Sequence, residues 1–265
     1  MMYEISELYV YPIKSLGGIA LNEAKLSECG IEYDRYWMLI DDNGRFITQR
    51  DIPKLALFKL KYLNDSLIVE YENHQIAIPT SLRKSVNVVS YIWKEDVIAS
   101  RESVEINNWF SQILEKQVYL VRKADNYPRY VKKHKDSGIN FPDSDQYLLT
   151  GQSSLDYLNS KLENQLNINR FRPNIVFKGG EFHAEDSWKI VAIGDSKFEI
   201  TKACARCKLT TINQESGELG KEPLKTLSKY RRSGGEVYFG QYLKLISSQD
   251  LTIKIGDKLI VEERK

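Results

Sequence analysis

The sequence predicts a β-rich α+β fold in two packed parts. Most patterned segments are short, rich in aromatic and β-branched residues, and bounded by turn-forming residues, as strands are. Only two segments repeat apolar residues at helical spacing. The chain has 265 residues, more than one hydrophobic core usually holds. We therefore expect two β-rich parts accompanied by a few helices.

Composition narrows the class of protein. Hydrophobic residues make up 42% of the chain and charged residues 28%, which excludes a disordered chain and a membrane protein. The 38 Lys and Arg against 36 Asp and Glu leave a formal charge of +2, too little to grip a nucleic-acid backbone. The 16 tyrosines would suit a nucleic-acid-binding barrel only beside a basic face. Met1–Ser15 lacks the order of a signal peptide. We expect a cytoplasmic protein that binds neither nucleic acid nor a membrane.

The first part of the chain reads as a small β barrel or sandwich. Asp42-Asn43-Gly44 is a strong turn signal between two strands. Alternation and β-branched or aromatic content predict strands at Tyr3–Tyr11, Tyr36–Ile40, Leu67–Tyr71 and Val86–Trp93.

A helix and a boundary follow. Apolar residues recur at helical spacing over Val104–Glu115, behind Ser103 as an N-cap. Val118–Val121 then reads as a strand, and Ala124–Asp145 is polar with prolines and other turn formers, as a loop or boundary would be. We therefore divide the chain into domains at 1–123 and 124–265.

The second part begins with a helix and continues with strands. Ser153 and Asp156 have the spacing of a capping box in front of an apolar helix face. Strands are predicted at Ile175–Phe177, Lys189–Ile193, Lys197–Thr201, Leu209–Ile212, Gln241–Leu245 and Lys258–Val261.

Cys204-Ala205-Arg206-Cys207 is the most reactive-looking segment. A neighbouring guanidinium favours the thiolate, which binds soft metals. A structural zinc site would need four ligands, but Cys29 and the three histidines are scattered. A thioredoxin-like dithiol would precede a helix, whereas we expect a strand at Leu209–Ile212. Two buried, inert thiols stay open as an alternative, and three cysteines are too few for a disulfide framework.

Several basic residues are placed as an anion site requires. Lys14 and Ser15 stand before permissive glycines directly after a strand. Arg172 precedes Pro173, which biases it to an extended conformation that aims the guanidinium outward. Taken singly, each is as compatible with a solvated loop or a surface salt bridge.

Two further segments add polar groups. Arg35 and Arg50 flank the Asp42-Asn43-Gly44 turn, so both can lie on one hairpin. Tyr242 follows Gly240, which would let a ligand approach closely. Each of these features is more often structural than functional when it occurs alone.

These segments form an ordered series along nearly the whole chain. They are Tyr11-Pro12-Ile13-Lys14-Ser15, the run from Gly30 to Trp37, Thr48-Gln49-Arg50, Asn169–Asn174, the run from Ala184 to Trp188, Ala203–Thr211, Lys221-Glu222-Pro223-Leu224 and Phe239–Tyr242. The series resembles the molybdenum cofactor sulfurase C-terminal (MOSC) domain proteins with an N-terminal β barrel, the subgroup that includes the mitochondrial amidoxime reducing component. The resemblance implies a β-rich α+β fold in which an N-terminal β-barrel-like domain packs on a MOSC β-barrel domain with a few helices.

The resemblance also implies a cofactor and the residues that hold it. Cys207 would be the protein ligand of the metal in a molybdenum–molybdopterin cofactor, and Asp186 would relay protons. The family is also associated with pyridoxal phosphate binding. Matched positions around the molybdenum cofactor are Lys14, Ser15, Arg35, Arg172 and Asn174, with Arg206 and Tyr242 beside it and Arg50, Thr150, Ser153 and Thr210 as further carry-overs.

The implied activity is a molybdenum-dependent oxidoreductase that reduces small N-hydroxylated compounds by two electrons. The sequence contains neither a dinucleotide fingerprint nor an iron–sulfur cysteine set, so a separate flavin, haem or iron–sulfur protein would supply the electrons. Because the chain begins at the barrel and ends at Lys265, we expect neither a membrane anchor nor a fused iron–sulfur domain. The alternative is a carrier that passes the molybdenum cofactor, or sulfur bound on Cys207, to another enzyme.

Overall fold

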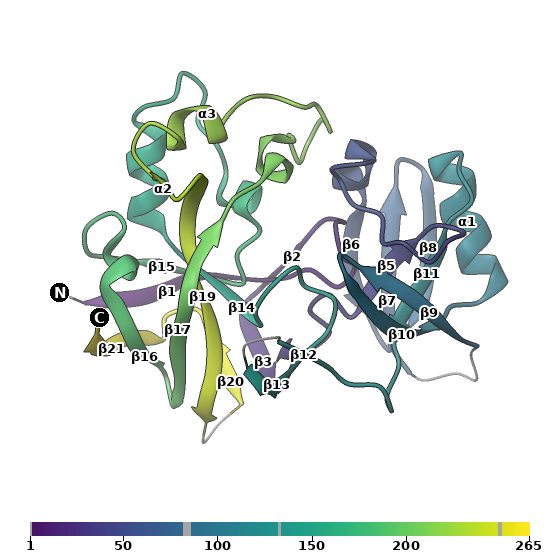
Figure 1. The fold of residues 1–265 in the computed structure, drawn as a ribbon, viewed down its shortest axis with the longest axis horizontal. Coiled ribbons are helices and arrows are strands. Elements are labelled where there is room, and N and C mark those ends of the chain that lie inside the picture. The colour runs from purple at the N-terminus through teal and green to yellow at the C-terminus, as the bar shows by residue number, and fades with distance from the viewer. Residues whose placement is uncertain (1, 82–85, 132–133, 249–250) are drawn as a thin grey trace.

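The computed structural model describes residues 2–81, 86–131, 134–248 and 251–265 (Figure 1). Its largest element is a closed seven-stranded barrel, which the pairing of the last strand with the first completes. The barrel strands, in spatial order, are β14 (Tyr147–Gly151), β15 (Ile175–Lys178), β1 (Tyr3–Val10), β21 (Lys258–Arg264), β16 (Trp188–Ile193), β17 (Ser196–Ala205) and β19 (Glu236–Ser248). The short strands β2 (Ile19–Leu21) and β18 (Arg232–Ser233) extend it.

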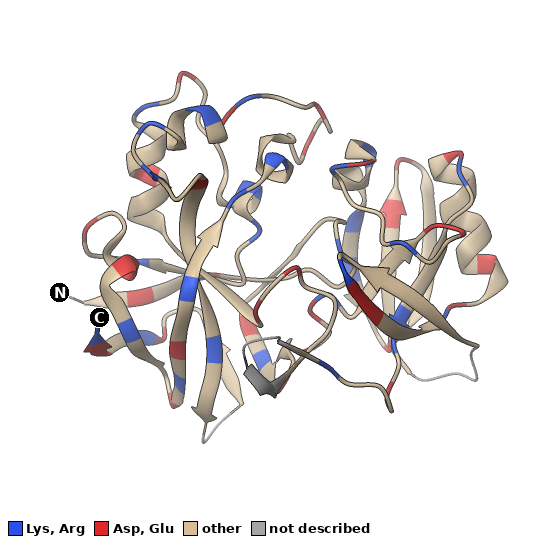
Figure 2. Cartoon of the chain, viewed as in Figure 1, with Lys and Arg blue, Asp and Glu red and all other residues tan. Residues whose placement is uncertain are grey.

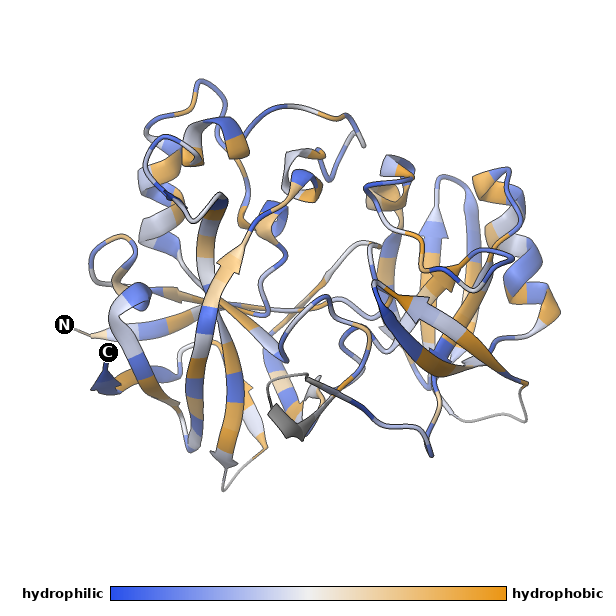
Figure 3. Ribbon diagram, in the orientation of Figure 1, coloured by the Kyte–Doolittle hydropathy of each residue, from blue (hydrophilic) through white to orange (hydrophobic). Residues whose placement is uncertain are grey.

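Strand β1 comes from the start of the chain but lies between β15 and β21 in this barrel. Figure 3 shows hydrophobic and hydrophilic segments alternating along the barrel strands, as strands with one buried face require. The buried face includes Tyr3, Tyr147, Phe177 and Trp188. The predicted domain division at 123 and 124 stays a prediction, while the strand pairing places β1 with the second half of the chain.

The second body of the fold consists of two small sheets and a helix around their own core (Figure 1). Buried Trp37, Phe58 and Phe110 occupy that core. One sheet is β5 (Trp37–Ile40), β11 (Tyr119–Lys123), β10 (Glu95–Arg101) and β9 (Asn87–Ile92); the other is β6 (Lys59–Leu63), β7 (Ser66–Tyr71) and β8 (His74–Pro79); the helix is α1 (Val104–Leu114).

The remaining elements are short. They are a sheet of β20 (Thr252–Lys254), β3 (Glu23–Ser27) and β4 (Gly30–Ile31); the hairpin of β12 (Arg129–Val131) and β13 (His134–Ile139); the helices α2 (Gln152–Asn159) and α3 (Leu224–Leu227); and the 3-10 turns η1 (Pro53–Leu57), η2 (Ile168–Phe171), η3 (Ala184–Ser187) and η4 (Lys208–Thr211). Figure 2 shows acidic and basic residues interspersed over both bodies. Within the described residues, no helix is both long and apolar enough to cross a membrane.

The predicted β-rich class and most predicted strands are confirmed. So is α1, whose N-cap Ser103 accepts a hydrogen bond from the Ile106 amide at 3.4 Å. The capping box is wrong, because α2 already begins at Gln152 and the Ser153 hydroxyl donates to the Glu181 carbonyl instead. The predicted loop at Ala124–Asp145 contains the β12–β13 hairpin.

The strand predicted at Leu209–Ile212 is also wrong, since Lys208–Thr211 forms the 3-10 turn η4. The hydroxyls of Thr210 and Thr211 donate to the carbonyls three residues earlier, at 2.9 and 2.7 Å. Such local side-chain bonds favour a turn over a strand. A helical turn therefore follows the cysteine pair. The predicted strand at this position was the reason for excluding a thioredoxin-like dithiol, and that reason no longer applies.

Candidate functional site

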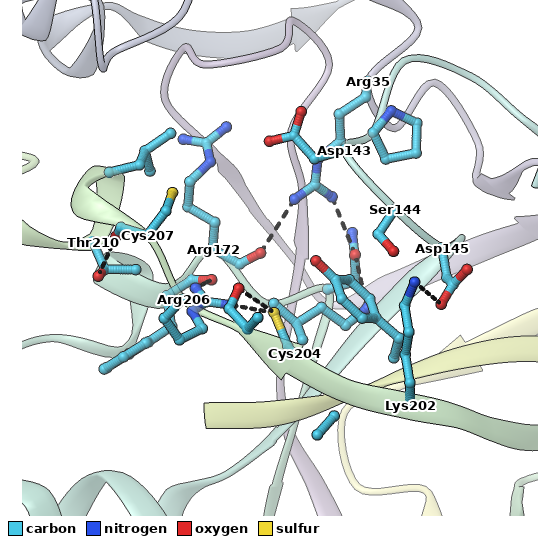
Figure 4. Close-up of a pocket in the computed structure, with 18 of the residues that line it drawn as sticks. Arg35, Asp143, Ser144, Asp145, Arg172, Lys202, Cys204, Arg206, Cys207 and Thr210 are labelled. Atoms are coloured by element: carbon cyan, nitrogen blue, oxygen red, sulfur yellow. Dashed lines mark hydrogen bonds and ion pairs between the residues drawn. The ribbon is translucent and has the colours of Figure 1, made fainter. Parts of the chain in front are cut away.

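A cavity of about 670 Å³ opens between the barrel and the second body. Its lining comes from the segment after β1, from the segments holding Arg35 and Arg50, and from the β9–β10 turn. It also includes residues 142–145, the end of η2 and the end of β17 with η4. Figure 4 shows Arg172, Arg206 and Cys207 on one side of this space and Arg35 and Asp143 on another. Residues distant in sequence thus meet in one site.

The cavity concentrates positive charge. Two acidic residues in its lining, Asp143 and Asp145, face six basic ones, an excess of four in a protein whose formal net charge is +2. Such a local excess attracts anions. The six basic residues are Lys14, Arg35, Arg50, Arg172, Lys202 and Arg206.

The two thiols of the cysteine pair have different surroundings. Cys207 is exposed at the end of the β17 segment, just before η4, and lines the cavity. Its Sγ accepts a hydrogen bond from Arg50 Nη1 at 3.6 Å. Cys204 is only 1% exposed, and Arg206 Nη1 donates to its Sγ at 2.7 Å. The guanidinium beside Cys207 therefore comes from Arg50. Of the two cysteines, only Cys204 fits the alternative of a buried, inert thiol.

Arg172 and Arg35, which line the cavity, both lie against the ring of the buried Tyr11. Their guanidinium groups lie 4.3 and 4.5 Å from the centroid of the Tyr11 ring, within cation–π range. Arg172 is buried and donates Nη1 to the Leu16 carbonyl at 2.6 Å, and burial lowers its pKa to about 10. Arg35 donates to the Asn174 side-chain oxygen at 3.1 Å and to the Arg172 carbonyl at 3.2 Å.

Arg172 differs from its prediction in two respects. Its backbone is left-handed, with φ of 54°, because it caps the C-terminal end of η2 rather than continuing as an extended segment. Its side chain is 7% exposed, so the guanidinium points into the protein and not to solvent. Pro173 favours an extended conformation for Arg172, but the position of Arg172 at the C-terminal end of η2 outweighs that preference.

Lys14 is anchored by the segment between the two bodies. Its Nζ donates to the Phe141 carbonyl at 2.9 Å and pairs with Asp143 at 2.5 Å. Burial lowers the pKa of Lys14 to about 8, with Asp143 opposing the shift. Burial would raise the pKa of Asp143, but Lys14 and Arg50 outweigh it and hold that pKa well below its usual range. Ser15 lines the cavity beside Lys14 in a left-handed conformation.

The donor set fits an anionic cofactor that brings its own metal ligands. In the part of the chain that the structure describes, buried Arg50 Nη2, Arg172 Nη2 and Arg206 Nε have no hydrogen-bond partner. Unpaired buried donors are costly, and phosphate or pterin oxygens would satisfy them. Among the described residues no three His, Cys, Asp or Glu side chains gather to hold a metal. A metal here would need most of its ligands from a cofactor, with Cys207 as a protein ligand.

The other predicted residues divide into two groups. Thr210 and Tyr242 line the cavity, and burial, with Cys204 nearby, raises the pKa of Tyr242 well above its usual value. Three do not line it: Thr150 is buried on β14, Ser153 bonds to the Glu181 carbonyl, and Asp186 pairs with Arg231 at 2.6 Å. The geometry therefore gives no support for a proton relay through Asp186.

Gly240 also has a different role from the one predicted. Its φ is 80°, and a Cβ there would lie 2.7 Å from Thr150 Cγ2 and 2.8 Å from the Leu149 carbonyl oxygen. The space beside this glycine is filled by β14, where the barrel closes, and not by a ligand.

Sequence reasoning missed Asp143 and Trp93, which both line the cavity. Asp143 accepts hydrogen bonds from Lys14 and from Trp93 Nε1. The only sequence signal for Asp143 was the acidic Pro142-Asp143-Ser144-Asp145 run in a segment interpreted as a boundary. For Trp93 it was a large aromatic residue directly before Lys94 at the end of a predicted strand.

Comparison with known proteins gives two family matches. Residues 2–117 match the MOSC N-terminal beta barrel domain, and residues 136–260 match the MOSC domain. Mitochondrial amidoxime-reducing component 1 is 32% identical in both Homo sapiens, over 96% of this chain and 81% of that protein, and Xenopus laevis, over 98% and 82%. Molybdenum cofactor sulfurase from Arabidopsis thaliana is 32% identical over 91% of this chain, which spans 33% of that protein.

Proposed function

The chain belongs to the family of proteins that join a MOSC N-terminal β-barrel domain to a MOSC domain, and we propose that its cavity binds a molybdenum–molybdopterin cofactor through the Cys207 thiolate. One observation carries the proposal. An exposed thiol stands at a cavity with an excess of four positive charges and three buried guanidinium nitrogens without partners among the described residues. Pyridoxal phosphate forms no part of the proposal.

Different residues of the cavity would contact different parts of the cofactor. Arg172 Nη2, Arg206 Nε and Arg50 Nη2, which have no partner among the described residues, are donors suited to phosphate and pterin oxygens. Lys14 and Arg35, whose nitrogens already bond to protein groups, add positive charge. Arg50 reaches both Cys207 Sγ and the Asp143 carboxylate, so it keeps a positive charge beside the thiolate. Residues that would complete the cradle are Ser15, Asn174, Thr210 and Tyr242.

We propose that the protein reduces small N-hydroxylated compounds. Two electrons and two protons break the N–O bond, and the products are the reduced nitrogen compound and water. When bound, the cofactor supplies the two-electron redox chemistry. The chain orients the substrate in the cavity and keeps the Lys14 Nζ proton donor there, held by Asp143. A separate flavin, haem or iron–sulfur protein in the cytoplasm would deliver the electrons.

Turnover with an artificial reductant tests this proposal. Protein purified from cells that make the cofactor should reduce an N-hydroxylated purine base with reduced viologen, and should not do so with NADH alone. Adding a suitable electron-donor protein and its reductase should restore turnover with NADH. A molybdenum-loaded sample that reduces no N-hydroxylated compound with viologen would contradict the proposed reaction.

The alternative is a carrier of the cofactor or of sulfur on Cys207. The match to about a third of a plant molybdenum cofactor sulfurase favours considering it. A carrier would release its cargo to an acceptor protein and show no turnover. Measuring cofactor transfer in the same preparation as viologen-driven turnover separates the two functions.

A further inference from the structure

Trp93 is an exposed aromatic residue at the mouth of the cavity. It lies in the turn between β9 and β10 and lines the cavity together with Cys207. Its side chain is 58% exposed, although indole is among the largest apolar groups. Its ring contacts the partly buried Phe46 edge-on, with centroids 5.2 Å apart, but more than half of its surface stays accessible.

The second feature of Trp93 is its backbone conformation. Its φ is 56°, in the left-handed region where glycine and asparagine are at ease and a bulky residue is uncommon. The same geometry occurs at Asn64 and Glu72, the first residues of the β6–β7 and β7–β8 turns, so it belongs to the two-residue hairpin turn and fixes where the Trp93 side chain leaves the backbone.

Neighbouring side chains hold the indole in place. Its Nε1 donates to Asp143 Oδ1 at 3.2 Å, and the Arg50 guanidinium lies 4.7 Å from the ring centroid. Arg50 in turn donates to Cys207 Sγ at 3.6 Å. The ring is thus fixed one side chain away from the thiol, while much of its surface stays open.

We propose that Trp93 is the platform on which a flat, uncharged N-hydroxylated substrate stacks beside Cys207. This inference rests on the proposed function and adds a residue that recognises the planar substrate. A planar π system gains most from stacking on an indole face. The Arg50 guanidinium, 4.7 Å from the ring centroid, disfavours a cationic substrate on this ring. A small aliphatic hydroxylamine has no ring to stack and should not depend on Trp93.

The test compares Trp93→Ala and Trp93→Phe with a matched control, Tyr91→Ala. Tyr91 is 40% exposed near the end of β9, two residues before Trp93, but does not line the cavity. The probes are 6-N-hydroxylaminopurine, which is planar and uncharged, and N-methylhydroxylamine, which is aliphatic. Dissociation constants are measured on the oxidised, cofactor-loaded protein, and KM and kcat with reduced viologen.

Trp93→Ala should raise the dissociation constant and KM for the purine about tenfold, as loss of one stacking contact does, and leave kcat unchanged. Trp93→Phe should retain most of the affinity, and Tyr91→Ala should match wild type. An equal loss for N-methylhydroxylamine, or a purine affinity in Trp93→Ala equal to that of Tyr91→Ala, would overturn the platform. If the wild type turns over neither compound, the proposed function fails, while the dissociation constants still decide the role of Trp93.

Discussion

Arg172 illustrates what distinguishes the cavity at the level of single residues. Its guanidinium is buried, yet one of its terminal nitrogens, Nη2, has no partner in the described structure. Leaving a buried donor unpaired costs about 1–3 kcal/mol, so an anion that accepts from it gains that amount on binding. The same reasoning applies to Arg50 and Arg206.

Arg172→Lys should therefore weaken cofactor retention about tenfold while the protein stays folded, because lysine keeps the charge but loses the fork. Molybdenum content after dialysis and the thermal midpoint of unfolding measure the two effects. Arg170→Lys, in the same turn but outside the cavity lining, is the control. A lower thermal midpoint with unchanged molybdenum content would assign Arg172 a purely structural role.

Glu185 offers a prediction about pH. The carboxyl is 0% exposed, lies near Ser154 Oγ at 3.2 Å, and burial raises its pKa to about 7 from an ordinary value of 4.5. The folded protein thus keeps a proton between about pH 4.5 and 7 that the unfolded chain has lost. Its contribution to stability is full below this window and is lost as pH rises through it.

Glutamine at position 185 stays uncharged at every pH, so Glu185→Gln should remove the loss of stability at rising pH. Urea unfolding should show equal stability of variant and wild type near pH 4, and a variant more stable by up to about 3 kcal/mol near pH 8. A stability difference that is the same at both pH values would show that Glu185 does not titrate in this range.

Five of the six basic residues that line the cavity, all except Lys202, were singled out from the sequence because they stand in recognisable motifs. Their partners were not. Arg50 and Cys207 are separated by 157 positions, and only the packing of the two bodies brings them together. Trp93 and Asp143 belong to no motif, and an aromatic residue at a strand end or a short acidic run does not by itself indicate a cavity lining.

At the level of elements, the barrel closes where β14 meets β19, and Gly240 makes this close approach possible. The strands were predictable from alternation, whereas the turn η4 was not, because a short apolar and β-branched run fits either state. The hydroxyls of Thr210 and Thr211, which donate to the carbonyls three residues earlier, favour the turn over a strand.

Gly240→Ala should destabilise the protein by roughly 2–5 kcal/mol, from the left-handed backbone and the clash with Thr150 and Leu149 together. Gly234→Ala is the control, since Gly234 has φ of 55° with nothing within 4 Å, and should cost only about 1–2 kcal/mol. Urea unfolding measures both, and equal losses would mean that the close approach at β14 contributes nothing.

At the level of the whole molecule, the site exists because the chain passes between two bodies. Strand β1 belongs to the barrel, the chain then presents Lys14 and Ser15 to the cavity, and it continues to β5 in the second body. A two-part β-rich fold was predictable from sequence, but this crossing was not, because strand patterns do not specify partners distant along the chain.

The central claim is that Cys207 is the protein ligand of a molybdenum cofactor. The most direct test is the molybdenum content of wild type, Cys207→Ser and Cys204→Ser purified from cells that make the cofactor. We predict about one molybdenum per chain in wild type, most of it retained in Cys204→Ser and nearly all lost in Cys207→Ser, because a serine hydroxyl is a poor substitute for a thiolate. Wild-type molybdenum content in Cys207→Ser, or equal loss in both variants, would contradict the assignment.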